Sequence, residues 1–305
     1  MKSKMRNKIT RKITGLLFIL LLSISMIGCS GSDSSSAGTE DGGAADTQTG
    51  QEQEAQNNQE ESDTEPLIVA MELAYPPFET RNDAGEPEGV SVDLMRAFGE
   101  YAGREIQIEN TSWDGLIPSL QTGKADIVIS SMTIRPDRAE QVDFSDPYAN
   151  ALLAVLVNKD TDASSIEDLN RAGMKIAVKA GSTGHLYAES NLQNAELMAL
   201  PDESACVMEV AQGRADGFIY DQLTIYRNWQ NNLDTTKAIF IPFQEPEKWG
   251  IAVQKGNSEL LEQVNAFLKE FREEGGYDKL AETYLSEEKK AFDELGFQWF
   301  FDLAD

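Results

Sequence analysis

Short apolar runs alternate with amphipathic segments from residue 66 to the end of the sequence. The apolar runs predict buried strands, and apolar residues spaced three or four positions apart predict helices. Strands are expected at residues 67–70, 106–108, 127–129, 151–157, 175–178, 217–220, 239–241 and 249–253. Helices are expected at residues 92–101, 113–122, 166–169, 206–212, 258–274 and 277–285, with others starting near residues 136 and 184. This alternation predicts an α/β fold, and the chain from residue 66 to residue 305 is long enough for two lobes.

Three hydroxyl side chains, Ser130, Ser131 and Thr133, follow the expected strand at residues 127–129. The next helix is expected to begin at Pro136, because proline is favoured at the first helical position, and it carries Arg138 in its first turn. Hydroxyl groups and backbone N–H groups beside an arginine at a helix N-terminus are suited to bind a carboxylate. A first-turn arginine can equally lie on the surface, and two serines after a strand often form only a turn. The residues of this stretch alone leave both interpretations open.

One short pattern occurs in both halves of the chain. A glycine, a basic residue, an alanine and an aspartate stand at residues 123–126 and again at residues 213–216. In each half the pattern follows an expected helix and precedes a buried strand that ends in polar residues. Ligands of open α/β sheets bind at the carboxyl ends of the strands. Two lobes whose polar strand ends face each other would therefore form a ligand cleft.

The first 29 residues have the pattern of an export signal. A basic start without acidic residues is followed by an apolar segment from about Leu16 to Ile27, which is shorter than the roughly 20 apolar residues of a membrane-spanning helix. A glycine directly before Cys29 resembles the lipobox of bacterial lipoproteins. This resemblance implies a signal peptide at residues 1–28 and a lipid on Cys29. An ordinary cleaved signal or an uncleaved anchor, with Cys29 incidental, is the alternative.

Residues 30–65 are expected to form a disordered acidic tether. They hold ten acidic residues, no basic residue and no apolar side chain larger than alanine. Such a segment cannot bury enough apolar surface to offset the entropy lost on ordering. The whole sequence has a formal charge of −26, so loss of the six bases of the signal brings it to −32. Nucleic acid is not an expected partner of so acidic a chain.

Cysteine and histidine are too few for a metal or heme site. After Cys29 the sequence contains only Cys206, in an apolar segment that is expected to be helical, and its single histidine is His185. The mature chain therefore has no intramolecular disulfide, and Cys206 is expected to be a small core residue. No cofactor and no metal are expected.

Seven motifs follow one another between about residues 66 and 285. They are Tyr75-Pro76-Pro77-Phe78-Glu79, Val92-Asp93-Leu94-Met95, Trp113-x-x-Leu116-Ile117-Pro118-Ser119-Leu120, Gly123-Lys124-Ala125-Asp126, Ser131-Met132-Thr133-x5-Arg138, Asp143-Phe144-Ser145-Asp146-Pro147-Tyr148 and Gly213-Arg214-Ala215-Asp216. In this order they closely resemble the polar-amino-acid solute-binding proteins of bacterial ATP-binding-cassette (ABC) importers, solute-binding family 3.

The resemblance implies a two-lobed periplasmic-binding-protein-like fold of type II, with the ligand cleft between the lobes and two hinge crossovers. Lobe 1 is expected at residues 66–156 plus 249–305, and lobe 2 at residues 157–248. The hinges are expected near residues 156–160 and 244–249. The lobes would close around a free amino acid, and the closed form would dock on the membrane permease of the importer. The protein is expected outside the cytoplasm, anchored by the lipid on Cys29 to the outer face of the bacterial cell membrane.

The resemblance also implies roles for individual residues. Arg138 would bind the α-carboxylate of the ligand with both ends of its guanidinium group, and Asp221 would accept hydrogen bonds from the α-ammonium group. Tyr75 and Trp113 would flank the ligand's side chain. The complete set of expected ligand-binding residues is Glu72, Tyr75, Trp113, Ser130, Ser131, Thr133, Arg138, Lys179, Ser182, Thr183 and Asp221.

Glu72 and Lys179 would face the far end of the ligand's side chain. Glu72 suits a basic side chain, and Lys179 suits an amide or a carboxylate. Together they favour a side chain that both donates and accepts hydrogen bonds, so a glutamine-like ligand is expected, with a basic amino acid as the alternative.

Two other classes of function stay open. An enzyme on the same fold, similar to cyclohexadienyl dehydratases, could use Glu72 and Lys179 as acid and base. A sensory amino-acid receptor would need a signalling partner. The aromatic residues after Leu285 extend past the family pattern and are expected to pack on the first lobe, with a partner-binding surface as the alternative.

Overall fold

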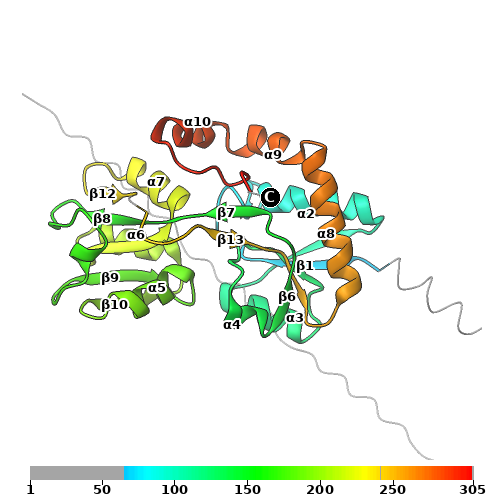
Figure 1. Ribbon diagram of the computed structural model, residues 1–305, viewed down its shortest axis with the longest axis horizontal. Coiled ribbons are helices and arrows are strands. Elements are labelled where there is room, and N and C mark those ends of the chain that lie inside the picture. The colour runs from blue at the N-terminus through cyan, green and yellow to red at the C-terminus, as the bar shows by residue number, and fades with distance from the viewer. Residues whose placement is uncertain (1–64, 241, 304–305) are drawn as a thin grey trace, which may run out of the picture. The chain divides into compact units, whose positions relative to one another are not determined.

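The structure, a computed structural model, describes residues 65–240 and 242–303 (Figure 1). The predicted signal peptide and Cys29 lie outside these residues, as does the expected tether up to residue 64. Within the described part, none of the helices combines the length and the apolar character that crossing a membrane requires.

The first of two five-stranded sheets has the strand order β4-β1-β5-β14-β6. Strand β1 pairs in parallel with β4 and β5, whereas β14 pairs antiparallel with β5 and β6. The strands are β1 (Leu67–Met71), β4 (Ile106–Asn110), β5 (Ile127–Val128), β6 (Val142–Phe144) and β14 (Ala252–Gln254).

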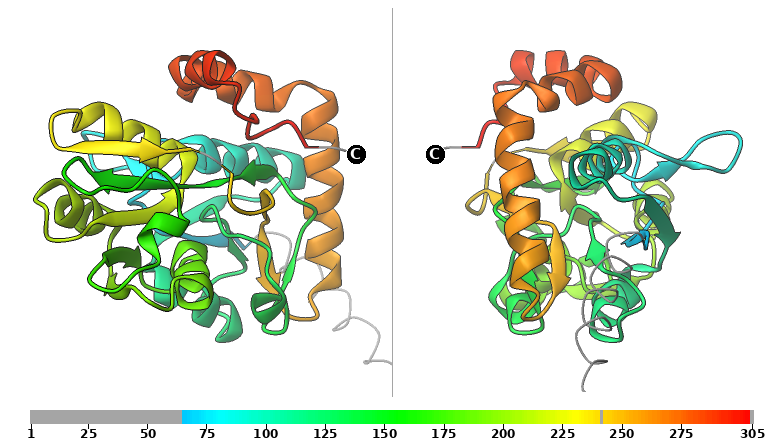
Figure 2. Two further views of the ribbon diagram at one scale, coloured as in Figure 1. Left: turned by 60° about the vertical axis from the view of Figure 1, so that its left-hand side comes forward. Right: turned by 90° about the vertical axis from the view of Figure 1, so that its right-hand side faces the viewer.

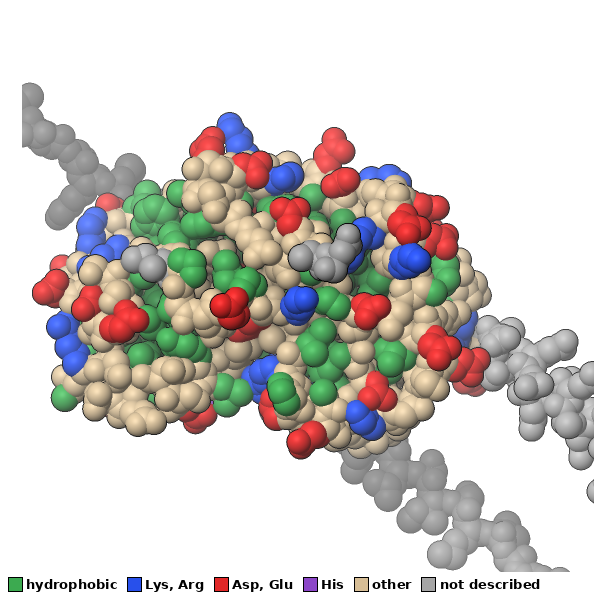
Figure 3. Space-filling view, in the orientation of Figure 1, with side chains coloured by type: hydrophobic (Ala, Val, Ile, Leu, Met, Phe, Trp, Pro, Cys, Tyr) green, Lys and Arg blue, Asp and Glu red, His purple; other side chains and the backbone are tan. Residues whose placement is uncertain are grey.

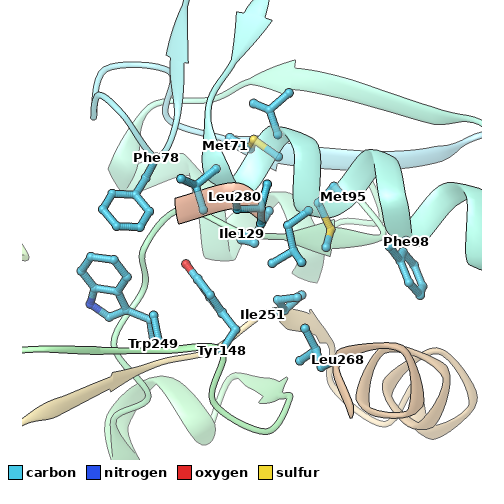
Figure 4. Close-up of a cluster of buried hydrophobic side chains, with 14 of the residues drawn as sticks. Met71, Phe78, Met95, Phe98, Ile129, Tyr148, Trp249, Ile251, Leu268 and Leu280 are labelled. Atoms are coloured by element: carbon cyan, nitrogen blue, oxygen red, sulfur yellow. The ribbon is translucent and has the colours of Figure 1, made fainter. Parts of the chain in front are cut away.

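Helices cover both faces of this sheet. Because side chains alternate along a strand, Leu67, Val69 and Met71 of β1 enter one core and Ala70 enters another. The larger core also receives α2 (Val90–Ala102), α8 (Ser258–Glu273) and α9 (Gly276–Tyr284), and Figure 4 shows part of it. The smaller core receives α3 (Leu116–Gln121), which follows a 3-10 turn, η1, at Trp113–Gly115. The predicted helix at residues 113–122 thus begins as a 3-10 turn, and Gly123, with φ of 68°, follows its end as expected.

The second sheet has the strand order β10-β9-β11-β8-β12. Its strands are β8 (Leu153–Asn158), β9 (Lys175–Lys179), β10 (Glu196–Leu200), β11 (Gly217–Asp221) and β12 (Thr236–Ile239). One face packs on α5 (Thr183–Asn191), and the other packs on α6 (Glu203–Ala211) and α7 (Gln222–Asn231). Cys206 of α6 is fully buried in that second core, which confirms the expected core position.

Two short strands join the two sheets. Strands β7 (Ala149–Ala151) and β13 (Glu247–Trp249) pair antiparallel with each other, and Figure 1 shows them between the sheets. The expected strand at 151–157 is therefore two strands, and the lobe boundary expected at residue 156 falls inside β8. Strand β8 is hydrogen-bonded on both sides within the second sheet, to β11 and β12. The apolar run at residues 151–157 continues from the last residue of β7 into β8 without a break, so the pattern contained no mark of the crossover.

Smaller differences concern the ends of elements. The strand expected at 239–241 is β12 at Thr236–Ile239, and the strand expected at 249–253 is divided into β13 and β14 by Gly250 and Ile251. The helix expected at 166–169 is a 3-10 turn at Glu167–Leu169. Helix α7, strands β6 and β10 and helix α10 (Ser286–Leu295) were not predicted.

The C-terminal segment packs on the first core and also reaches the second lobe. Trp299 and Phe300 are 6 % and 3 % exposed and belong to the larger core of the first sheet, which confirms the expected packing on the first lobe. The backbone N–H of Asn150 in β7 donates to the carbonyl oxygen of Phe300 at 2.7 Å. The ring of Phe297 lies 4.9 Å, between centroids, from the ring of Phe240 beside the second sheet. Figure 2 shows α9 and α10 running from the end of α8 across toward the second sheet.

Candidate ligand-binding cleft

One pocket lies between the two sheets, and all eleven predicted ligand-binding residues line it. They come from the carboxyl ends of strands in both sheets and from the segments that follow those ends, as expected for an open α/β sheet. The first lobe contributes Glu72, Tyr75, Trp113, Ser130, Ser131, Thr133 and Arg138, and the second contributes Lys179, Ser182, Thr183 and Asp221. The structure thus brings the residues together, and their role in binding stays a prediction.

Arg138 is a buried cation of the first lobe. It lies in α4 (Pro136–Ala139), whose first residue is Pro136 as predicted, and only 4 % of it is exposed. Its Nη1 donates to the carbonyl oxygen of Thr133 at 2.9 Å, and its Nη2 donates to that of Gly181 in the other lobe at 3.2 Å. Among the described residues no carboxylate lies within ion-pair distance of it. Burial lowers the pKa of Arg138 to about 10, so the side chain stays charged at neutral pH.

Asp221 is a buried anion with one oxygen unused. It is the N-cap of α7, where its Oδ1 accepts the backbone N–H groups of Leu223 and Thr224 at 2.9 and 3.0 Å. Its Oδ2 is buried and has no hydrogen-bond partner among the described residues. The hydroxyl of Tyr75, close enough to Asp221 to lower the pKa of its carboxyl, also lacks a partner in hydrogen-bond geometry. Burial outweighs this effect and raises the pKa of Asp221.

Glu72 and Lys179 form an ion pair across the cleft, from Oε2 to Nζ. The other carboxylate oxygen of Glu72 accepts the backbone N–H of Trp113 at 3.3 Å. The ammonium nitrogen of Lys179 lies 5.4 Å from the centroid of the Trp113 ring, and the guanidinium carbon of Arg138 lies 5.1 Å from it. Trp113 therefore contacts both cations of the pocket as a cation–π partner.

Ser131, one of the two serines after β5, is held by Glu79, a glutamate that was not among the expected binding residues. Ser131 has a φ of 47°, and its hydroxyl donates to both oxygens of Glu79 at 3.0 and 3.1 Å. Glu79 is fully buried, also accepts the hydroxyl of Ser91 at 2.5 Å, and has its pKa raised to about 8 by burial. The Ser130 hydroxyl oxygen accepts the backbone N–H of Glu72 at 3.0 Å. These contacts fix the backbone at the rim of the pocket.

Thr133 and Thr183, one from each lobe, meet beside Glu247, a second glutamate that was not among the expected binding residues. Thr183 donates to the hydroxyl oxygen of Thr133 at 3.2 Å, and Thr133 donates to Oε2 of Glu247 at 2.7 Å. Glu247 lies on the crossover strand β13, and burial raises its pKa. Ser182 caps α5, because its hydroxyl oxygen accepts the backbone N–H of His185 at 3.1 Å. No motif marked Glu247, although it lies within the segment 244–249 where a hinge was expected.

Three of these contacts join the lobes: Glu72 to Lys179, Arg138 to Gly181, and Thr183 to Thr133. The structure therefore has the arrangement of a closed cleft. In residues 65–240 and 242–303, no group of three or more histidine, cysteine, aspartate or glutamate side chains is placed to hold a metal ion. On the face shown in Figure 3, acidic and basic side chains are scattered over both lobes.

Comparisons with known proteins agree with this geometry. The chain is 34 % identical over 223 residues to a probable histidine-binding protein of Neisseria gonorrhoeae, covering 72 % of this chain and 83 % of that one. It is 28 % identical to the ABC transporter glutamine-binding protein GlnH of Bacillus subtilis, covering 74 % and 83 %. The solved structure of an ancestral arginine-binding protein bound to glutamine is 36 % identical, with a TM-score of 0.66 over 72 % of this chain and 97 % of that one.

The family model of the bacterial extracellular solute-binding proteins, family 3, matches residues 67–287, which include every residue of the pocket. The match spans both sheets and both crossover strands. The chain therefore belongs to the bacterial extracellular solute-binding proteins of family 3.

Proposed function

We propose that the protein captures a free polar amino acid between its lobes and delivers it to the permease of an ABC importer. One observation carries the proposal: the same pocket holds Arg138, a buried cation, and Oδ2 of Asp221, a buried carboxylate oxygen, and among residues 65–240 and 242–303 the first has no acidic partner and the second has no donor. Every free α-amino acid carries a carboxylate and an ammonium group on the same α-carbon. Such a ligand would satisfy both residues at once, which supports the roles expected from the sequence.

The relatives support the class of ligand. Their names assign them histidine and glutamine, and the ancestral arginine-binding protein was solved with glutamine bound. All of these ligands are amino acids whose side chain has polar nitrogen atoms. The Glu72–Lys179 pair of this chain suits such a side chain, because it offers one acceptor and one donor side by side.

The proposed mechanism is hinge closure around the crossover strands β7 and β13. We propose that the lobes divide at these strands, because β8 belongs wholly to the second sheet. The contacts that join the lobes inside the pocket would form as the cleft closes, so ligand and closed form stabilise each other. The permease would then bind the closed form.

The enzyme alternative has less support. Its expected acid and base, Glu72 and Lys179, are paired with each other in the structure. The reported relatives are named as binding proteins. Incubation of the protein with each amino acid that it binds, followed by mass spectrometry, is expected to recover the ligand unchanged; a new product would favour the enzyme.

A thermal-shift panel tests the proposed function. The purified protein is heated with each of the twenty amino acids, and with cystine and ornithine. A ligand at a hundred times its dissociation constant adds about 2.7 kcal/mol to the free energy of unfolding. For a protein of this size the midpoint of unfolding should rise by roughly 5–10 °C. At least one polar amino acid is expected to give this shift, and the absence of any shift would contradict the proposal.

We also propose that Cys29 carries a lipid and holds the protein at the outer face of the cell membrane. The lipobox-like residues before Cys29 support this proposal, and the family description places its members outside the cell. The mass of the mature N-terminal peptide tests it. A chain that begins at Cys29 with added acyl groups is expected, and an unmodified cysteine would contradict the lipid anchor.

A further inference from the structure

We propose that Lys179 determines specificity by placing its own ammonium group in the cation site that a basic ligand side chain would need. This inference rests on the proposed function, and it names the ligand class as amino acids with an uncharged polar side chain. It follows from the groups that surround the lysine and from the other acidic groups of the pocket.

The cation site consists of Glu72 and Trp113. A carboxylate and the face of an indole ring are the two kinds of group that bind a cation best inside a protein. Lys179 contacts both, with its Nζ on Oε2 of Glu72 and 5.4 Å from the centroid of the Trp113 ring. Only 4 % of Lys179 is exposed, so the side chain is held inside the cleft.

The other carboxylates that line the pocket have partners of their own, either observed or proposed. The pocket is lined by three acidic residues, Glu72, Asp221 and Glu247. Asp221 is proposed to bind the α-ammonium group of the ligand. Glu247 accepts hydrogen bonds from Thr133 and, through Oε1, from Gln244, both at 2.7 Å. Glu72 is therefore the carboxylate that could pair with a charged ligand side chain, and it is already paired with Lys179.

A ligand with a basic side chain would bind less tightly for an electrostatic reason. It would have to separate the buried Glu72–Lys179 pair or place a second cation beside the first, and an unpaired buried charge is strongly unfavourable. An uncharged carboxamide avoids both outcomes, because its nitrogen can donate to Glu72 while its oxygen accepts from Lys179. The Glu72–Lys179 pair therefore favours a ligand with a carboxamide side chain over one with a basic side chain.

Titration calorimetry with L-glutamine, L-arginine and L-glutamate tests the assignment. The wild-type protein is expected to bind L-glutamine at least tenfold more tightly than L-arginine. Lys179→Met keeps the length of the side chain and removes its charge, so the ratio of the two affinities should shift toward L-arginine by at least tenfold. Lys175→Met is the matched control, because Lys175 is exposed at the other end of β9, and it should leave the ratio unchanged.

The reciprocal variant gives an independent test. Glu72→Gln leaves the ammonium group of Lys179 without its acid, so this variant should gain affinity for L-glutamate by at least tenfold. A wild-type preference for L-arginine would overturn the inference, as would folded variants with unchanged affinity ratios. If the wild-type protein binds no amino acid in the thermal-shift panel, the proposed function itself fails. If it binds one and the ratios do not move, only the role of Lys179 fails.

Discussion

Replacement of Arg138 by alanine is expected to weaken binding of the amino acid identified in the thermal-shift panel by at least a hundredfold. The guanidinium group is buried and has no acidic partner among the described residues, so a ligand carboxylate would gain two charge-assisted hydrogen bonds from it. Such bonds contribute about 1.5–3 kcal/mol each, and a hundredfold loss corresponds to about 2.7 kcal/mol. Titration calorimetry measures the change directly.

The control for this variant is Arg135→Ala. Arg135 precedes the same short helix, but its guanidinium group forms a two-point pair with Asp137, at 2.9 and 2.7 Å. Its loss should change the affinity by less than about fivefold, because a partly exposed local pair contributes little. Equal losses in the two variants would show that general positive potential, and not the Arg138 contact, attracts the ligand.

Replacement of Asp221 by asparagine should remove binding to a similar degree while leaving the fold intact. Asparagine is as good an N-cap as aspartate, so its side-chain oxygen can still accept the N–H groups at the start of α7. The free oxygen, however, becomes an NH2 group, which repels the ligand's ammonium group. Calorimetry should show a loss of a hundredfold or more, with an unchanged circular dichroism spectrum. An asparagine variant that binds as tightly as the wild type would refute the role of Asp221.

Asp221→Asn should also change how the stability of the ligand-free protein depends on pH. Burial raises the pKa of Asp221 in the folded protein, so this group favours folding at low pH and loses that contribution as pH rises through its folded pKa. The ligand-free asparagine variant should therefore lose less stability than the wild type between acid and neutral pH. Ligand binding has the opposite trend, since the ammonium group needs the ionised carboxylate. Wild-type affinity should fall as the solution is acidified below the raised pKa. Thermal melts with and without ligand measure both trends.

The parts of the fold that depend on local pattern could be predicted. Strands β1, β9 and β11 and helices α8 and α9 lie within a few residues of their expected places, because each is one uninterrupted apolar or amphipathic run. The crossover at β7 could not be found in this way. Its apolar residues continue directly into β8, and only the hydrogen-bond partners of the two strands distinguish them.

In the pocket, too, the residues marked by local motifs could be predicted, and those placed by distant contacts could not. The eleven expected residues meet because they stand at or after the carboxyl ends of strands, and these strand ends of both sheets border the pocket. Glu79 and Glu247 were missed for different reasons. Glu79 belongs to a quoted motif, but its role depends on the serines that fold over it, one of them 52 residues away. Glu247 lies 114 residues from the threonine that it binds. Contacts between residues so far apart in the sequence arise from the tertiary fold, and a pattern of neighbouring residues does not predict them.

The central claim is that the two charged ends of a free amino acid bind to Arg138 and Asp221. Its most direct test uses altered ligands rather than altered protein. The amino acid found in the thermal-shift panel is compared by titration calorimetry with its N-acetyl derivative and with its methyl ester. Each derivative removes one charge from the ligand and leaves the side chain unchanged. We predict that each binds at least a hundredfold more weakly than the free amino acid. Binding of either derivative at the affinity of the free amino acid would contradict the claim.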